Sequence, residues 1–363
     1  MPAPSPPKAL PLLLASEENA YRISLKPCGP AFRMLERPNG ATTETAVKPS
    51  IISGRTRIAS IAIFFLTVCA FFALTTDTFL TTANLLNLIR QSAPTLIVAV
   101  AMTFVITTGG IDLSVGSVLA LTGALLAIVL QAGWAWPLAV GAMLLLGGLV
   151  GLVNGWFTAY EGIPAFIVTL ASLSVVRGVA LLLTQGYSIP IAPESPAVQI
   201  GRGRVGELPI PALLAILAAI GGAVVLTQTR FGQYVTGIGA NAEAVRRAGV
   251  DIRRTALGVY LLSGVAAGLA GVITAARLGS GSSNAGVGFE LEVIAAVVLG
   301  GTNLFGGQGT IAGTVLGALT IGVIGNGLIL AHVSPFFTQI VTGIIILVAI
   351  WLNFRIFRAG RRR

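Results

Sequence analysis

The chain has 363 residues, of which 55% are hydrophobic and only 10% are charged, and its formal net charge is +10. Soluble domains carry about 25% charged residues, so this composition excludes an ordinary water-soluble domain. Nucleic-acid binding would need basic residues gathered on a soluble face, which a chain this apolar does not offer. The composition predicts a polytopic membrane protein.

Residues 1–57 differ from the rest of the chain. They are rich in proline and scattered charges and show no sustained periodicity. The apolar stretch Ala9–Ala15 is too short to span a bilayer, and its flanks do not resemble those of a signal peptide. We expect a disordered cytoplasmic N-terminal extension, with an over-long start of the reading frame as the alternative.

Ten apolar runs follow within residues 58–354, which we predict to form the membrane domain. A spanning helix needs roughly 17–25 apolar residues; several runs meet that length, whereas others are shorter and interrupted by glycine. The predicted fold is an all-α, polytopic helix bundle with eight to ten spans, of which ten is the preferred count. The runs are Ile58–Leu74, Pro94–Thr107, Leu113–Leu130, Pro137–Phe157, Phe166–Leu183, Ala212–Leu226, Leu257–Ala276, Ile294–Leu299, Ile311–Leu330 and Ile340–Leu352.

Basic residues gather before the first run, between the sixth and seventh runs, and in the tail 355–363. The positive-inside rule places such segments on the cytoplasmic side, and ten spans keep all three there. Both termini are therefore expected in the cytoplasm. The two cysteines and the single histidine, His332, form no metal-ligand pattern, so we predict no metal site and no catalytic residues.

Two glycine clusters interrupt apolar surroundings, "GGIDL" at Gly109–Leu113 and "GGTNL" at Gly300–Leu304. They suggest a weak internal repeat, because glycine-broken segments in both halves are typical of transporters. The span count places both clusters on one side, however, whereas an inverted repeat requires opposite sides. Either one span boundary is miscounted or the match is a coincidence of the glycine-rich composition. The glycines expected to be structural are Gly109, Gly110, Gly116, Gly300, Gly301, Gly306 and Gly307.

Asp112 stands directly before an apolar helix. A charged group inside a bilayer is costly and is retained when it faces a cavity, is paired, or caps a helix. An acidic residue at this place suits an N-cap, and we expect Asp112 to cap the third span. A role in lining or gating a pathway is compatible with that expectation.

A cytoplasmic segment, residues 229–256, contains a predicted short helix over Ala242–Arg247. The helix begins beside Asn241, carries Glu243 in its first turn, and ends at Gly249. So short a helix is not stable alone, so we expect it to dock on a partner; a solvated loop is the alternative.

Three stretches together resemble the permease subunit of bacterial ABC importers of the ribose/monosaccharide type, a group that shares a superfamily with branched-chain amino-acid permeases. They are Met102–Leu125, Gly239–Val250 and Phe289–Ala318. The second carries a form of the E-A-A-x-x-x-G element with valine for the third alanine. The third reads E-L-E-V-I-A-A, with glutamate where the family usually has aspartate. The resemblance runs from about Ile58 to Leu352.

The resemblance implies a coupling helix, with Asn241, Glu243, Ala244 and Gly249, that inserts into a separate ATPase subunit. That partner would bind ATP and magnesium, so this chain needs no cofactor and is not an enzyme. "LFGGQGT" (Leu304–Thr310) mimics an ATPase signature, but the chain has no phosphate-binding loop.

The resemblance also implies a permease homodimer in the bacterial inner membrane and a periplasmic binding protein that delivers a monosaccharide, with ribose or a related pentose as the leading candidate. Residues expected to line or shape the path are Thr107, Thr108, Asp112, Ser114 and Asn303.

Other functions stay open at this point. A branched-chain amino-acid or nucleoside ABC permease would share the same motifs. An ion-coupled secondary transporter would need several ionisable residues within its spans, and the candidates here are few: Asp112, Arg177, Arg277 and Glu290. An integral-membrane enzyme lacks any evident histidine cluster or nucleophile–base pair.

Overall fold

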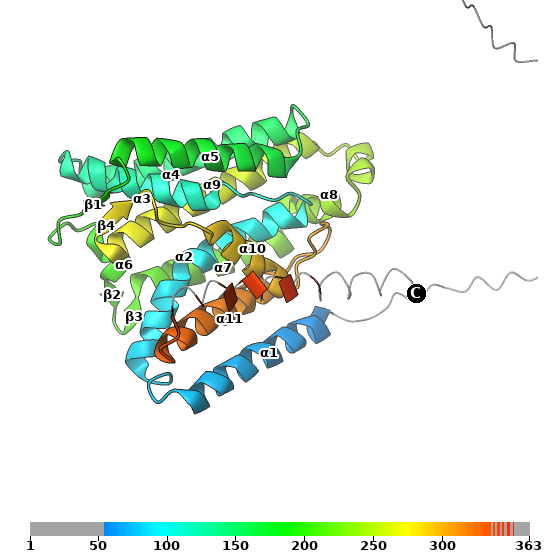
Figure 1. The fold of residues 1–363 in the computed structure, drawn as a ribbon. Helices are drawn as coiled ribbons and strands as arrows, with labels where there is room; N and C mark the ends of the chain where they lie inside the picture. Colours follow the sequence, from blue (N-terminus) through cyan, green and yellow to red (C-terminus); the bar gives the residue numbers. More distant parts are fainter. Residues whose placement is uncertain are drawn as a thin grey trace, which may run out of the picture. The chain divides into compact units, whose positions relative to one another are not determined.

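The computed structural model describes residues 54–334 and isolated positions between 337 and 351. The expected N-terminal extension up to residue 53, about half of the tenth apolar run and the basic tail 355–363 lie outside the described residues. Figure 1 shows the described part as a bundle of long helices that run back and forth between two ends.

Helices form most of the described structure. Their bounds are α1 Gly54–Thr75, α2 Thr82–Thr107, α3 Val115–Gln131, α4 Trp136–Ala159, α5 Ala165–Thr184, α6 Val198–Arg202, α7 Ile210–Gln228, α8 Arg230–Arg247, α9 Ile252–Leu278, α10 Phe289–Leu299 and α11 Ile311–Leu330.

The all-α expectation missed four short strands at one end of the bundle. β1 (Ser188–Pro190) pairs antiparallel with β4 (Ser280–Ser282), and β2 (Arg204–Val205) pairs antiparallel with β3 (Leu208–Pro209). Runs of two or three residues carry no periodicity that a sequence could reveal. The β1–β4 pair joins the segments that follow α5 and α9.

Seven of the described helices are long and apolar enough to cross a membrane: α1, α2, α4, α5, α7, α9 and α11. The third and eighth expected spans correspond to α3, which is shorter at 17 residues, and to α10, which has 11. Nine of the ten apolar runs thus coincide with helices, but ten full-length spans are not established. Helix α10 covers only part of a bilayer, because 11 residues rise about 17 Å.

Helix α2 begins well before the apolar run that predicted it. It starts at Thr82, where the Thr81 hydroxyl accepts a hydrogen bond from the Asn84 amide at 3.3 Å. Its first turns mix polar and apolar residues, so a search for apolar runs did not find them. Pro94 lies inside the helix, as membrane helices tolerate when neighbouring groups satisfy the freed carbonyl.

Small residues hold the centre of the bundle together. Helix α9 packs against α4, α3 and α2, and α2 and α9 are buried along most of their length. A methyl group added at Gly147 of α4 would clash with the Gly264 carbonyl of α9, and one at Gly151 would clash with the Tyr260 carbonyl. These glycines allow the close backbone approach that drives helix association in membranes.

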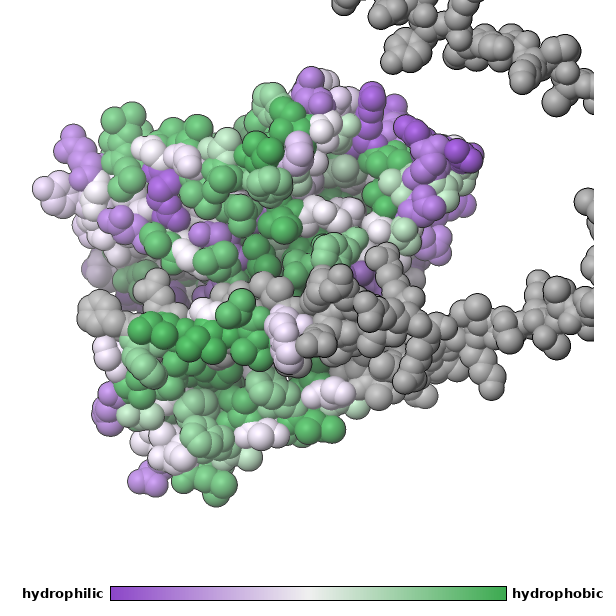
Figure 2. Space-filling model, turned by 45° about the vertical axis from the view of Figure 1, so that its right-hand side comes forward, coloured by the Kyte–Doolittle hydropathy of each residue, from purple (hydrophilic) through white to green (hydrophobic). Residues whose placement is uncertain are grey.

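The outer helices present an apolar surface. Helices α1 and α5 bury little of their length, and large side chains such as Leu66, Leu170 and Leu182 are exposed. Figure 2 shows apolar residues over much of the visible face and hydrophilic ones gathered toward the end that carries α8. An apolar surface of this extent fits lipid contact rather than water.

Candidate functional site

Asp112 lies in the connection between α2 and α3 and is only 1% exposed. One carboxylate oxygen accepts hydrogen bonds from the Ser114 amide at 3.0 Å and the Ser114 hydroxyl at 2.6 Å, and the other accepts from the Ser263 hydroxyl of α9 at 2.7 Å. The Asn154 side-chain amide of α4 donates to the Ser114 hydroxyl at 2.9 Å. The carboxylate therefore ties the α2–α3 connection to α4 and α9.

The expectation that Asp112 is the N-cap of the third span is wrong in detail. The N-cap of α3 is Ser114, whose side chain makes no capping bond. Asp112 stands two residues earlier and accepts the Ser114 N–H, an Asx-turn arrangement. Asp112 therefore bonds the first residue of the α3 N-terminus from a position outside the helix, and it also contacts α9 through Ser263. The sequence analysis did not identify Ser263 or Asn154. Each is a polar residue within an apolar helix, and that contrast was the signal that could have identified them.

The two glycine clusters meet at one place in the fold. The Gly307 amide donates to the Thr107 carbonyl at 2.9 Å, which joins the end of α2 to the α10–α11 connection. Gly239 of α8 completes the contact, because a methyl group there would clash with both the Thr107 carbonyl and the Gly307 amide nitrogen. The segments that carry the two clusters thus lie side by side, and the internal repeat stays a prediction.

The structural glycines fall into two groups. Four have a left-handed φ between +79° and +87°, a region that favours glycine: Gly109, Gly301, Gly306 and Gly307. At the other three, an added methyl group would lie too close to an atom of another segment: Gly110, Gly116 and Gly300.

The five residues predicted to line or shape a path are all bonded within the chain. Thr107, Asp112 and Ser114 are buried, and Thr108 and Asn303 are half-buried. The Asn303 side chain donates to the Gly306 carbonyl at 2.8 Å and accepts from the Phe305 amide at 3.1 Å. It therefore shapes the α10–α11 connection, and contact of these residues with a solute stays a prediction.

The predicted cytoplasmic helix is the second half of α8. The backbone is extended at Asn241 (φ −161°, ψ 94°), which breaks α8 in two. The Asn241 side chain accepts a hydrogen bond from the Ala244 amide at 3.0 Å. Gly249 then follows the helix with φ +82°. The expected start and end of this short helix are therefore confirmed.

Charge on the short helix faces outward. Glu243 pairs with Arg246 and, at 3.0 Å, with Arg247, and these three side chains are 47% to 79% exposed. Beside the helix lies a groove of about 440 Å³, whose lining includes Phe231, Tyr234, Gly249 and Arg254. Exposed polar residues next to an open groove are available for contact with a partner.

Arg177 of α5 is a second polar feature of the bundle. Its guanidinium donates to the Ser283 and Ala285 carbonyls at 2.6 Å each and to the Gly286 carbonyl at 3.2 Å. It therefore holds the segment between β4 and α10. Among the described residues, no three His, Cys, Asp or Glu side chains are close enough to hold a metal ion.

Comparison with known proteins identifies the family. Residues 84–350 match the family described as "Branched-chain amino acid transport system / permease component". The chain is 37% identical over 350 residues to the xylose transport system permease protein XylH of Escherichia coli strain K12, an alignment that covers 79% of this chain and 88% of the relative.

Ribose permeases are similarly close. The chain is 41% identical to the ribose import permease protein RbsC of Escherichia coli strain K12, over 76% of this chain and 87% of the relative. It is 42% identical to the ribose import permease protein RbsC of Bacillus subtilis strain 168, over 76% and 86%. No solved structure matches the chain. The resemblance drawn from the motifs is thus confirmed, and the chain belongs to the family of ABC-importer permeases that includes the ribose and xylose permeases.

Proposed function

We propose that this chain translocates a monosaccharide, with ribose or xylose as the leading candidates, across the bacterial inner membrane. The observation that carries the proposal is its similarity, over three quarters of its length, to permeases named for these two pentoses. The apolar outer surface and the polar connections inside the bundle suit a membrane path for a small hydrophilic solute.

The proposed topology has ten spans with both termini in the cytoplasm. In support, the start of α1 and the basic segment at α8 lie at the same end of the bundle (Figure 1), and both carry basic residues. Such residues favour the cytoplasmic side. Within this topology, α3 and α10 count as short spans and residues 340–352 supply the tenth.

The proposed partners are a cytoplasmic ATPase subunit, a periplasmic binding protein and a second copy of this chain. The ATPase would bind ATP and magnesium and dock on the short helix that carries Asn241, Glu243, Ala244 and Gly249. The short helix is exposed and carries charged side chains, which supports this role. A pull on the helix would reach the α2 end and the α10–α11 connection, because Gly239 packs against both.

The test is uptake of labelled ribose, xylose, galactose and leucine in cells with and without this chain, with ATP depleted or, separately, with the proton gradient collapsed. We expect loss of pentose uptake on ATP depletion alone. Dependence on the gradient alone would contradict the ATP-driven mechanism. Uptake of leucine in place of the sugars would favour the second candidate, an amino-acid permease, which the family's description suggests.

A further inference from the structure

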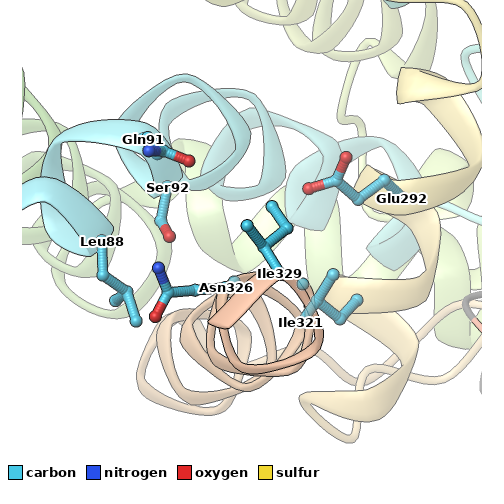
Figure 3. A pocket seen from close by; sticks show the side chains of 9 residues that line it. Leu88, Gln91, Ser92, Glu292, Ile321, Asn326 and Ile329 are labelled. Atoms are coloured by element: carbon cyan, nitrogen blue, oxygen red, sulfur yellow. The ribbon is translucent and has the colours of Figure 1, made fainter. Parts of the chain in front are cut away.

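A polar pocket that opens to the surface of the bundle lies between α2, α10 and α11, away from Asp112 and from the α8 helix; Gln91 and Ile329 in its lining are exposed. Its volume is about 210 Å³, and its lining includes Gln91, Ser92, Glu292 and Asn326 together with Ile321 and Ile329. Figure 3 shows Ser92 of α2 and Asn326 of α11 on one side of the space and the Glu292 carboxylate of α10 on the other.

The polar groups of this pocket have bonding capacity that the protein leaves unused. Ser92 is only 5% exposed, yet no described residue bonds its hydroxyl. One oxygen of Glu292 accepts a hydrogen bond from the Thr95 hydroxyl at 3.0 Å, whereas no described residue donates to the other. Thr95 therefore fixes the carboxylate and leaves its second oxygen free.

The Asn326 side chain is held in the same way. Asn326 and Asn84 exchange two amide hydrogen bonds of 3.0 Å each. A primary amide carries two N–H donors and an oxygen with two acceptor sites, so one donor and one acceptor remain after this exchange. The pocket therefore offers an oriented amide, a hydroxyl and a carboxylate oxygen, all short of partners.

Polar groups without partners are unfavourable where they are shielded from water. Ser92 is buried, and Glu292 and Asn326 are half-buried, so this space suits water or a polar solute. Its volume equals about seven water molecules at roughly 30 Å³ each, which is small for a drug-like ligand but sufficient for one pentose. Donors and acceptors on two walls suit hydroxyl groups, and the isoleucines offer apolar walls to the carbon face of a sugar ring. A carboxylate repels phosphates and carboxylates, so anionic solutes do not fit. Among the remaining solutes, a neutral sugar is the one that the proposed function supplies.

We infer that this pocket is a binding site for the transported monosaccharide, in which Glu292, Ser92 and Asn326 bind its hydroxyl groups. The inference rests on the proposed function and adds the residues and the place at which the sugar is held during transit. Glu292 would be the main acceptor, since hydrogen bonds to a charged group are stronger than those between neutral groups.

Gly325 provides a way to fill the pocket without disturbing its walls. It lines the pocket on α11, and no described atom lies within 4 Å of a β-carbon added there. Gly325→Leu therefore places a side chain in the cavity. The matched control is Gly141→Leu on α4, where an added β-carbon also meets no described atom and where the neighbouring Leu138 and Leu145 are exposed.

The experiment uses the full importer, this chain with its ATPase and binding protein, in proteoliposomes. Uptake of labelled ribose and xylose is measured beside ATP hydrolysis stimulated by the loaded binding protein. We expect Gly325→Leu to lower kcat/KM for uptake by about tenfold or more, since a filled pocket cannot admit solute. Stimulated ATP hydrolysis should stay within about twofold, because the pocket is remote from the α8 contact, and Gly141→Leu should match the unmodified chain in both readouts.

A second variant, Glu292→Gln, keeps the shape and the bond from Thr95 but removes the charge. We expect KM for uptake to rise by about tenfold, the usual effect of losing a charge-assisted hydrogen bond, and the ribose-to-xylose ratio to change. Unchanged uptake in both variants would overturn the inference. So would a parallel loss of uptake and ATP hydrolysis, which would indicate a structural role. If the unmodified importer carries leucine and neither sugar, the proposed function fails by itself.

Discussion

Replacement of Asp112 tests whether its carboxylate acts by hydrogen bonding or by charge. Asp112→Leu removes the acceptor of three hydrogen bonds, from the Ser114 amide, the Ser114 hydroxyl and the Ser263 hydroxyl. Of the three donors, the buried backbone N–H of Ser114 is the one that cannot rotate toward another acceptor. An unpaired buried donor costs about 1–3 kcal/mol. With the lost side-chain bonds added, we expect the free energy of unfolding to fall by about 3 kcal/mol.

Asp112→Asn should be far milder. The asparagine oxygen can still accept both bonds from Ser114, and its amino group can donate to the Ser263 hydroxyl. The loss should stay below about 1 kcal/mol, and most uptake should remain. The assay is thermal unfolding of the detergent-solubilised chain, together with sugar uptake in cells at matched expression. Equal and complete loss of uptake in both variants, with the asparagine variant still folded, would refute this reasoning and indicate a charge-dependent role.

Three further substitutions follow from backbone and loop contacts. Gly249→Val should abolish uptake while the chain remains in the membrane, because the left-handed φ of +82° costs a side-chain-bearing residue about 1–2 kcal/mol; Gly249→Asn, which tolerates this conformation, should retain more uptake. Gly239→Val should lower the melting temperature, because its side chain would clash with the Thr107 carbonyl, and overpacking costs about 1–3 kcal/mol; a smaller shift than that of Gly221→Val, where the space is open, would contradict this. Arg177→Met should raise hydrogen exchange of residues 280–288, whereas Arg177→Lys, which keeps a donor, should raise it less; equal exchange in all three proteins would show that the arginine does not hold this segment.

Local features of the fold were readable from the sequence because their causes are local. Apolar runs marked nine helices, since a helix in lipid satisfies its own backbone and needs only apolar side chains. The break in α8 was equally readable. Asn241 accepts a bond from the amide three residues later, and Gly249 adopts the left-handed conformation that ends the helix. Both signals lie within one turn of the feature that they produce.

Features that depend on distant partners were not readable. The expectation for Asp112 failed in detail because Ser114 is the N-cap of α3. The second oxygen of Asp112 is bound by Ser263, a residue of another helix whose approach no local pattern encodes. The pocket beside Glu292 was missed for the same reason. Its walls come from three helices, and its polar groups are scattered singly along apolar or mixed sequence. Gln91 and Ser92 were missed as well, because the first part of α2 lies outside any apolar run.

The backbone contact at Gly239 connects the short helix of α8 to the interior of the bundle. Gly239 meets the Thr107 and Gly307 backbones with no side chain between them, so this part of α8 cannot move without moving the end of α2 or the α10–α11 connection. The extended residue Asn241 lies only two positions further on. If the backbone at Asn241 were flexible, a movement of the short helix would be lost there and would not reach Gly239. The bond from the Ala244 amide to the Asn241 side chain stiffens this backbone, so we expect the motion of a docked partner to reach the bundle interior at Thr107.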